Sequence, residues 1–273
     1  MKDLSNENII HIKRNNIEYI QFKKLLDYKE IVNAFTLNKF GFDIGSNSTF
    51  IQNKDKFVEN YKILAKDLNI DYNNIIRPYQ THTDCIKIVE KQVKEISIFP
   101  DELTNVDGLL TTKSNIVFSL TYADCTPLFL YDPIKKVIGN IHSGWRGTVQ
   151  KIGQKAVKTM IEKYNSNPKD IICCIGPTIR KCHFEVDEDV MNLFHKQFYN
   201  ISKVNNIIEK KPNNKYNIDT VLINKLMLKE IGLIDKNIID SNICSCCNSD
   251  IIHSYRMNKE KAGRCTAIIG LRK

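Results

Sequence analysis

The sequence predicts an α+β fold with mixed β-sheets. Strand-like and helix-like segments alternate irregularly along the 273 residues. Several apolar runs are joined by connections too short for the helical crossover between parallel strands, so we expect antiparallel pairs among them. No change in composition marks a boundary, so we expect a single domain over residues 1–273 with a substantial buried core.

In the first half of the chain, runs rich in β-branched and aromatic residues predict strands. Residues 54–68 instead place Phe57, Tyr61, Leu64 and Leu68 at helical spacing, which predicts an amphipathic helix. The predicted strands cover 17–22, 31–37, two parts of 74–90, 116–122, 127–133 and 135–144.

The second half begins with one continuous apolar stripe over 148–164, which predicts a long helix. A buried strand at 171–176 and a helix at 187–198, with acids in its first turn, follow. Asp219 is expected to cap a helix that Gly232 ends. We expect a polar surface connection at 200–216 and closing strands at 249–256 and 265–271.

Composition limits the function classes. The net charge of +9 comes from lysines spread along the chain, which favours an anionic small substrate over a nucleic-acid partner. No run approaches the roughly 20 apolar residues of a membrane span, and the start lacks a secretory h-region. We therefore expect a cytoplasmic protein without a membrane partner. Nine cysteines, an odd number in a long chain, indicate free thiols or metal ligands.

Three predicted turns carry a soft metal ligand, in QTHTD (80–84), YADC (122–125) and HSGWRG (142–147). His82, Cys125 and His142 lie too far apart in sequence for a zinc finger, and each alone has an ordinary structural explanation. Each lies at a strand end, however, where side chains converge. Together they would bind Zn²⁺ and leave one position open, as in catalytic sites. A blue-copper site is the competing assignment.

The HSGWRG stretch also suggests an anion site. Trp145 and Arg146 stand between glycines just before the long predicted helix, whose first N–H groups suit an anion, and the Arg146 guanidinium binds phosphate or carboxylate in bidentate fashion. The alternative is a core tryptophan beside an arginine that pairs with a surface acid. Arg256 and Arg264 would add positive charge to the site or lie in a solvated hairpin.

The remaining cysteines give a weaker pattern. Cys244 and Cys247 have C-x₂-C spacing and, with the distant Cys265, would make a second metal site, but we expect buried or free thiols instead. Cys173, Cys174 and Cys182 are typical of small core residues.

Seven motifs occur in an order that resembles one bacterial family. It has long been labelled multicopper polyphenol oxidase or laccase domain, and is now described as zinc-dependent purine nucleoside phosphorylases. The likeness extends from about Ala34 to the C-terminus. The motifs are QTH, DGLLT, TYADCTPLFLYDP, IHSGWRGT, CIGPTIRKCHFEV, NIDT…NK and SYR…AGR.

The resemblance implies a layered α+β sandwich of mixed sheets flanked by helices. It implies zinc at His82, Cys125 and His142, and phosphorolysis of adenosine, inosine, guanosine and methylthioadenosine, with adenosine deamination as a second activity. Three positions depart from the family pattern: Ser143 replaces a more common alanine, Met257 a common arginine, and Leu37, after the Thr of FTLNKFGF, the usual arginine. We expect Gln80, Trp145, Arg256 and Arg264 to bind the substrate.

Phosphorolysis needs a phosphate beside C1′ of the nucleoside. We expect Arg146 and the helix start at 147–149 to hold it, Asp124 to orient a ligand or carry a proton, and Glu185 to be a further proton carrier. The number of histidines limits one alternative function, and others stay open. A non-enzymatic binding module is the least attractive of them, because an open three-ligand site stabilises a fold poorly. Six histidines without an H-x-H pair are too few for a multicopper oxidase, although a single-copper phenol oxidase remains possible. A Cys–His or zinc amide hydrolase acting on cell-wall substrates is the main rival. The oligomeric state is not indicated.

Overall fold

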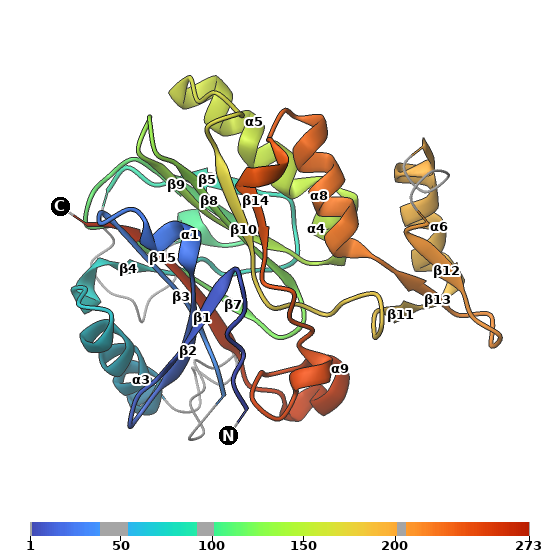
Figure 1. The fold of residues 1–273 in the computed structure, drawn as a ribbon, viewed down its shortest axis with the longest axis horizontal. Coiled ribbons are helices and arrows are strands. Elements are labelled where there is room, and N and C mark those ends of the chain that lie inside the picture. Colours follow the sequence, from blue (N-terminus) through green and yellow to red (C-terminus); the bar gives the residue numbers. More distant parts are fainter. Residues whose placement is uncertain (1, 39–53, 92–100, 201–205, 273) are drawn as a thin grey trace.

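Two β-sheets packed face to face form the centre of the molecule, and helices cover their outer sides (Figure 1). The computed structural model describes residues 2–38, 54–91, 101–200 and 206–272. Within these ranges each of the two large sheets has six strands and combines parallel with antiparallel pairs. The layered α+β sandwich of mixed sheets is therefore confirmed.

The first sheet is antiparallel except at one edge, where the last two strands run parallel. Its order is β1 (Ile9–Lys13), β2 (Glu18–Phe22), β3 (Ile31–Thr36), β15 (Cys265–Leu271), β7 (Val117–Tyr122) and β4 (Ile75–Ile76). A short helix, α1 (Lys23–Leu26), links β2 to the turn before β3. The predicted strands at 17–22, 31–37, 116–122 and 265–271 all lie in this sheet.

The second sheet is antiparallel in the middle and parallel at both edges. Its order is β14 (Ile238–Asp240), β10 (Ile172–Ile175), β8 (Thr126–Asp132), β9 (Val137–Ser143), β6 (Gly108–Thr111) and β5 (Ile86–Ile88). Its central strands are buried on both faces, which explains their continuous apolar runs.

Side chains alternate between two cores along the central strands. From β8, Phe129 and Tyr131 point between the sheets, and Phe129 packs edge-on against Phe22 with ring centroids 5.4 Å apart. Leu128 and Leu130 of the same strand face the opposite side and pack under the helices. This alternation gives the molecule its four layers, because each sheet buries both of its faces.

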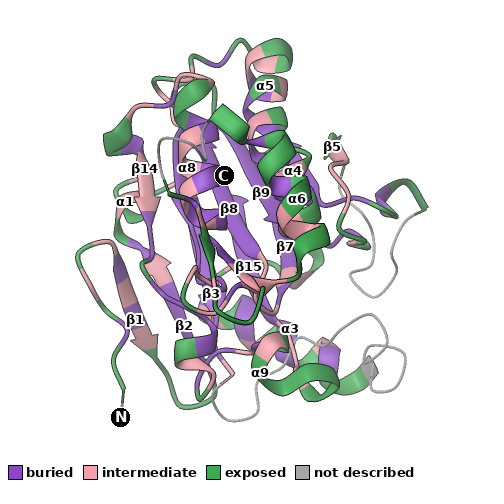
Figure 2. Cartoon of the chain, turned by 90° about the vertical axis from the view of Figure 1, so that its right-hand side faces the viewer, coloured by how far each residue is buried: buried purple, intermediate pink, exposed green. Residues whose placement is uncertain are grey.

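The outer layers are helical. On the first sheet, α3 (Lys54–Asp67) packs Phe57, Tyr61 and Leu64 against the strands, as their spacing predicts. On the second sheet lie α5 (Ile152–Tyr164) and α8 (Thr220–Glu230). Figure 2 shows the buried strands between these partly exposed helices.

The long helix predicted over 148–164 is interrupted. The chain forms α4 (Trp145–Val149), and α5 begins only after Lys151, which has a left-handed backbone with φ of 62°. The break lets the apolar stripe serve two cores: Val149 packs against a peripheral cluster, whereas Ile152 lies under the second sheet.

A small third sheet and α6 (Glu188–Gln197) stand at one side of the sandwich (Figure 1). The sheet contains β11 (Glu185–Val186), β13 (Tyr216–Ile218) and β12 (Ile208–Lys210). The helix predicted at 187–198 is confirmed. The connection predicted at 200–216 is only partly a loop, because β12 occupies part of it; residues 201–205 lie outside the described ranges.

Toward the C-terminus, Asp219 caps α8 by accepting a hydrogen bond from the Leu222 N–H at 2.8 Å, and Gly232 follows with φ of 107°, as expected. The strand predicted at 249–256 is wrong. The N–H groups of Ile251 and Ile252 close a turn on the carbonyl of Asn248 instead, and α9 (Tyr255–Asn258) follows. Among the helices described, none has the length and apolar character needed to cross a bilayer.

Candidate active site

His82, Cys125 and His142 come together where the chain passes from one sheet to the other. His82 lies in the connection from β4 of the first sheet to β5 of the second, and Cys125 lies in the connection from β7 to β8. His142 is on β9, where it pairs with Pro127 of β8, so the register places it close to Cys125. One ligand atom from each of the three residues lies within 4.8 Å of the others.

Asp107 is the carboxylate that organises this group. Its Oδ1 accepts a hydrogen bond from His142 Nδ1 at 2.7 Å, which leaves Nε2 of that ring for a metal. The same carboxylate accepts the backbone N–H groups of His82 and Thr83, at 3.1 and 2.7 Å. The Asp107 carboxylate therefore holds His142 through the imidazole ring and His82 through the backbone N–H.

The residue types alone did not identify Asp107, and Asp124 was expected to orient a ligand. The available signal was the DGLLT motif, in which Asp107 directly precedes β6. Since Gly108 of β6 pairs with Ile141 of β9, the acid falls next to His142.

The backbone around the ligands is strained and crowded. His82 and Asp124, the residue before Cys125, have positive φ angles of 64° and 86°. A Cβ on Gly144 would lie 3.1 Å from Cys125 Sγ and 3.0 Å from a His82 ring carbon, so a larger residue would push on two ligands. Strain of this kind is costly, and it persists at functional sites because the surrounding structure holds it.

Electrostatics favour a charged pair at the centre of the group. Burial opposes ionisation of Cys125, but His142 and His82 lower the pKa of its thiol to about 6. Burial likewise opposes a charge on His142, but Cys125 and then Asp107 raise the pKa of its imidazole to about 9. A thiolate is the form that binds a metal or acts as a nucleophile.

The group lies at a cavity of about 820 Å³. All the residues that the sequence indicated as site residues line it: Gln80, His82, Asp124, Cys125, His142, Trp145, Arg146, Arg256 and Arg264. Glu185 lines it as well. Lining residues that sequence reasoning did not indicate include Ile179, Phe184, Val186, Tyr255 and Lys259.

Trp145 and Arg146 stack on each other at the cavity. The Arg146 guanidinium lies over the Trp145 ring, 4.2 Å from its centroid, and Arg146 is exposed while Trp145 is half-buried. The helix start expected at 147–149 lies two residues earlier, since Gly144 is the N-cap of α4. The first turn therefore begins at Trp145.

Gln80 and Asp124 line the cavity and also tie its walls together. The Gln80 amide bonds the backbone of Thr121 in both directions, at 3.1 and 2.8 Å. The Asp124 carboxylate accepts the Ser245 hydroxyl and the Arg256 backbone N–H, each at 2.6 Å. Contacts of this kind position the loops of the cavity.

The sequence suggested a second metal site with Cys244, Cys247 and Cys265, but the structure groups different residues. Cys244 and Cys247 lie beside Cys182 and His183, with ligand atoms all within 4.8 Å of one another. Cys265 lies in β15 and is not among them. Cys182, expected in the core, is exposed.

Residues 41–272 match the family described as "Multi-copper polyphenol oxidoreductase laccase". The chain belongs to this family. Among curated relatives, "Purine nucleoside phosphorylase YlmD" of Bacillus subtilis is 31% identical over 252 residues, which are 89% of this chain and 90% of the relative. "Adenosine deaminase RL5", from an unidentified prokaryote, is 31% identical over 203 residues, 74% of this chain and 76% of that protein.

Two solved structures share the fold. A Bacillus licheniformis protein described as "hypothetical protein YfiH" matches with a TM-score of 0.84 and 26% identity, over 95% of this chain and all of that one. YlmD from Geobacillus stearothermophilus matches with a TM-score of 0.85 and 23% identity, over 97% of this chain and all of that one. The family model and the sequence relatives confirm the family that the motifs indicated, and the structures confirm its fold.

Proposed function

We propose that the protein is a zinc-dependent purine nucleoside phosphorylase, acting on nucleosides such as adenosine, inosine, guanosine and methylthioadenosine, with adenosine deamination as a second activity. The observation that carries the proposal is the three-ligand group of His82, Cys125 and His142, which opens onto a cavity of about 820 Å³. The names of the relatives as phosphorylases and one deaminase support it.

The donor set fits zinc. One thiolate and two imidazoles are ordinary zinc ligands, and three protein ligands leave a position for substrate or water. The Asp107–His142 contact is the second hydrogen bond that metal-bound histidines usually make. When bound, zinc would supply Lewis acidity next to the reacting nucleoside. A multicopper cluster would need more imidazoles than the six in this chain.

Positive side chains would hold the phosphate. Arg146 is exposed at the cavity, and Arg256, Lys259 and Arg264 line it from the C-terminal loops. A guanidinium binds a phosphate in bidentate geometry, so Arg146 is our first candidate for the contact beside C1′. The first-turn N–H groups of α4 lie beside it and are the second candidate.

An apolar wall would hold the purine. Ile179, Phe184 and Val186 lie on the side of the cavity formed by the loop after β10 and the small sheet. Aromatic and branched side chains bind a flat base by burying its faces. Such contacts do not distinguish the exocyclic groups of different purines, which agrees with a broad nucleoside range.

Proton transfer would fall to a carboxylate in the cavity. Glu185 is half-buried and lines the cavity, so it is our candidate for donating a proton to the leaving purine or in deamination. Both oxygens of Asp124 already accept hydrogen bonds, so we assign it to positioning the cavity wall.

The test is to incubate the zinc-loaded protein with adenosine, with and without inorganic phosphate, and to separate the products. Adenine and ribose 1-phosphate formed only with phosphate would support the phosphorylase. Inosine formed at the same rate in both samples would support the second activity alone. Neither product from protein shown to contain zinc would overturn the proposal.

A Cys–His hydrolase is the second candidate, and the thiolate–imidazolium pair of Cys125 and His142 favours it. In metal-free protein, alkylation of Cys125 by iodoacetamide should increase as the pH rises through about 6, the pKa of its thiol. Zinc should suppress that alkylation and restore phosphorolysis. Activity that survives chelation and is lost on alkylation would favour the hydrolase instead.

A further inference from the structure

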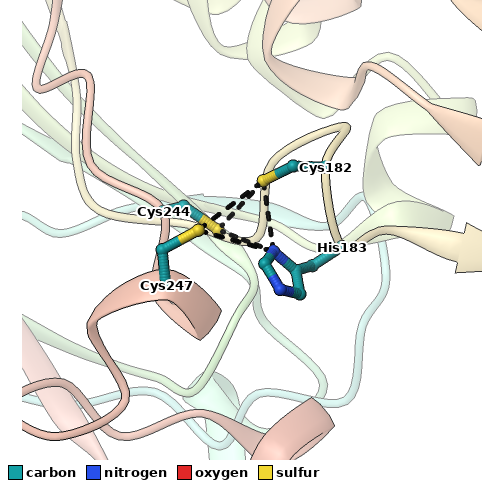
Figure 3. A group of neighbouring side chains, drawn as sticks. All are labelled: Cys182, His183, Cys244 and Cys247. Carbon is teal, nitrogen blue, oxygen red and sulfur yellow. Dashed lines mark hydrogen bonds between the residues drawn. The ribbon is translucent and has the colours of Figure 1, made fainter.

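A second group of potential metal ligands lies outside the three-ligand site. Cys182 and His183 are neighbours in the loop after β10, and Cys244 and Cys247 flank the turn that follows β14. Figure 3 shows the three sulfur atoms and the imidazole pointing toward one common centre. Neither the C-x₂-C pair nor the adjacent Cys–His pair is a complete set, so only the fold assembles the four ligands.

Five of the six distances between ligand atoms lie within about 0.4 Å of those in a tetrahedral zinc site. Zinc–sulfur bonds of about 2.3 Å and zinc–nitrogen bonds of about 2.1 Å at tetrahedral angles place two sulfurs about 3.8 Å apart, and sulfur and nitrogen about 3.6 Å apart. Cys182 Sγ lies 3.6 Å from Cys244 Sγ and 3.9 Å from Cys247 Sγ. His183 Nδ1 lies 3.2, 3.7 and 3.6 Å from the sulfurs of Cys182, Cys244 and Cys247.

We propose that Cys182, His183, Cys244 and Cys247 bind a structural zinc ion. Four protein ligands leave no open position, which is the arrangement of structural rather than catalytic zinc. Three thiolates and one imidazole also select zinc over the hard cations, which prefer oxygen. Cys182 and Cys247 are exposed, so the ion can enter from solvent.

A backbone bridge and an ion pair hold the two ligand loops together. Thr178 and Cys244 form a parallel bridge, in which Thr178 donates to Ile243 and accepts from Ser245, at 3.3 and 3.0 Å. Arg180, two residues after Thr178 in the loop that follows β10, forms a bidentate ion pair with Asp240 at the end of β14, at 2.9 and 2.8 Å. The ligands therefore approach one another on fixed loops.

The proposed zinc site supports one wall of the cavity. The carbonyl of His183 accepts a hydrogen bond from Arg256 Nη1 at 2.9 Å, and Phe184 and Glu185 of the cavity follow directly in the chain. On the other loop, Ser245 and Cys246 donate to the carboxylate of Asp124. A metal at this position would fix the residues on both sides of Arg256.

A disulfide is the competing fate for these thiols. The two sulfur–sulfur distances from Cys182, 3.6 and 3.9 Å, are far longer than a bond of about 2.05 Å. A disulfide would also leave the third cysteine and the imidazole of His183 without a role. The arrangement of four donors around one centre is explained by a metal and not by a pair of cysteines.

The test counts zinc in purified full-length variants by elemental analysis. Wild type should bind about two zinc ions per chain. Cys182→Ala and Cys247→Ala should each bind about one, while His82→Asn should also bind about one by losing the other ion. Cys265→Ala is the matched control, because Cys265 lies outside both groups, and it should retain two. Wild type with only one ion, or Cys182→Ala with two, would overturn the proposal.

Wild-type protein supplies a second test that does not depend on folding of the variants. Metal-free protein titrated with Co²⁺ should show intense visible bands of tetrahedral cobalt and thiolate charge-transfer absorption for two ions, one of them with three sulfur ligands. Free-thiol titration of denatured, unreduced protein should find all nine cysteines. A deficit of two thiols within Cys182, Cys244 and Cys247 would show a disulfide and contradict the proposal.

Discussion

The part of the chain that the structure describes holds two groups of cysteine and histidine that resemble each other in chemistry and differ in architecture. His82 and Cys125 lie in connections between the two large sheets, His142 lies in β9, and all three line the cavity; His82 and the residue before Cys125 have positive φ angles. The second group, Cys182, His183, Cys244 and Cys247, lies on two loops and has one more protein ligand. The comparison indicates that the number of protein ligands, rather than their type, separates a site for chemistry from a site for stability.

Matched histidine substitutions should separate the two roles and give the largest effect. His82→Asn should lower the phosphorolysis rate by about 10³-fold, because several kcal/mol of transition-state stabilisation are lost with the metal. Asparagine tolerates the positive φ of His82, so the backbone should be retained. His183→Asn should lower the rate by less than about tenfold, since His183 is not among the cavity-lining residues and its backbone carbonyl, which accepts from Arg256, is kept in the variant. Equal losses in the two variants, measured under saturating zinc, would remove the distinction.

Asp107→Asn should sharpen the assignment of the first group. Loss of the charged partner of His142 should weaken zinc binding by about 10- to 100-fold, as is typical when the hydrogen-bond partner of a metal ligand is altered. Competition with a chromophoric chelator measures the affinity. The second group makes no contact with Asp107 among the contacts described, so the variant should still retain one tightly held ion.

Arg146→Ala tests whether phosphate binds beside the three-ligand group of His82, Cys125 and His142. Removal of one charged hydrogen-bond donor should raise the phosphate KM by about 10- to 100-fold. Zinc content should stay the same, because Arg146 stacks on Trp145 and is not a ligand. An unchanged KM for phosphate would show that another cation, such as Lys259 or Arg264, makes the contact.

The smallest effect should be on thermal stability. Cys247→Ala should destabilise the fold by about 2–3 kcal/mol, a typical cost for loss of a structural feature in a large domain, and lower Tm by roughly 5–10 °C. Calorimetry with and without added zinc checks this. Zinc should raise the Tm of wild type more than that of the variant, whereas identical shifts would argue against a structural ion.

Much of the fold and of the first group was predictable from local patterns. Segments such as 127–131 are continuously apolar because they are buried on both faces. The helix spacing of Phe57, Tyr61 and Leu64 shows directly which face packs on the sheet. The break at Lys151 was not predictable, because a left-handed residue inside an apolar stripe depends on the two cores that the stripe must serve.

The second group could not be assembled from the sequence for a related reason. Cys244 and Cys247 gave a visible pair, but their partners are 61 or more residues away. The two loops are brought together by the bridge between Thr178 and Cys244 and by the ion pair of Arg180 with Asp240. Likewise Asp107 became recognisable as a partner of His142 through the pairing of β6 with β9. Long-range register, rather than residue type, carried the missing information.

Zinc-edge anomalous diffraction from crystals of the zinc-loaded protein tests the central comparison most directly. The account predicts two peaks: one at His82, Cys125 and His142 with a non-protein atom completing the coordination, and one at Cys182, His183, Cys244 and Cys247 with protein ligands alone. A single peak at the first group, or a fourth protein ligand that closes it, would contradict the division of roles between the two sites.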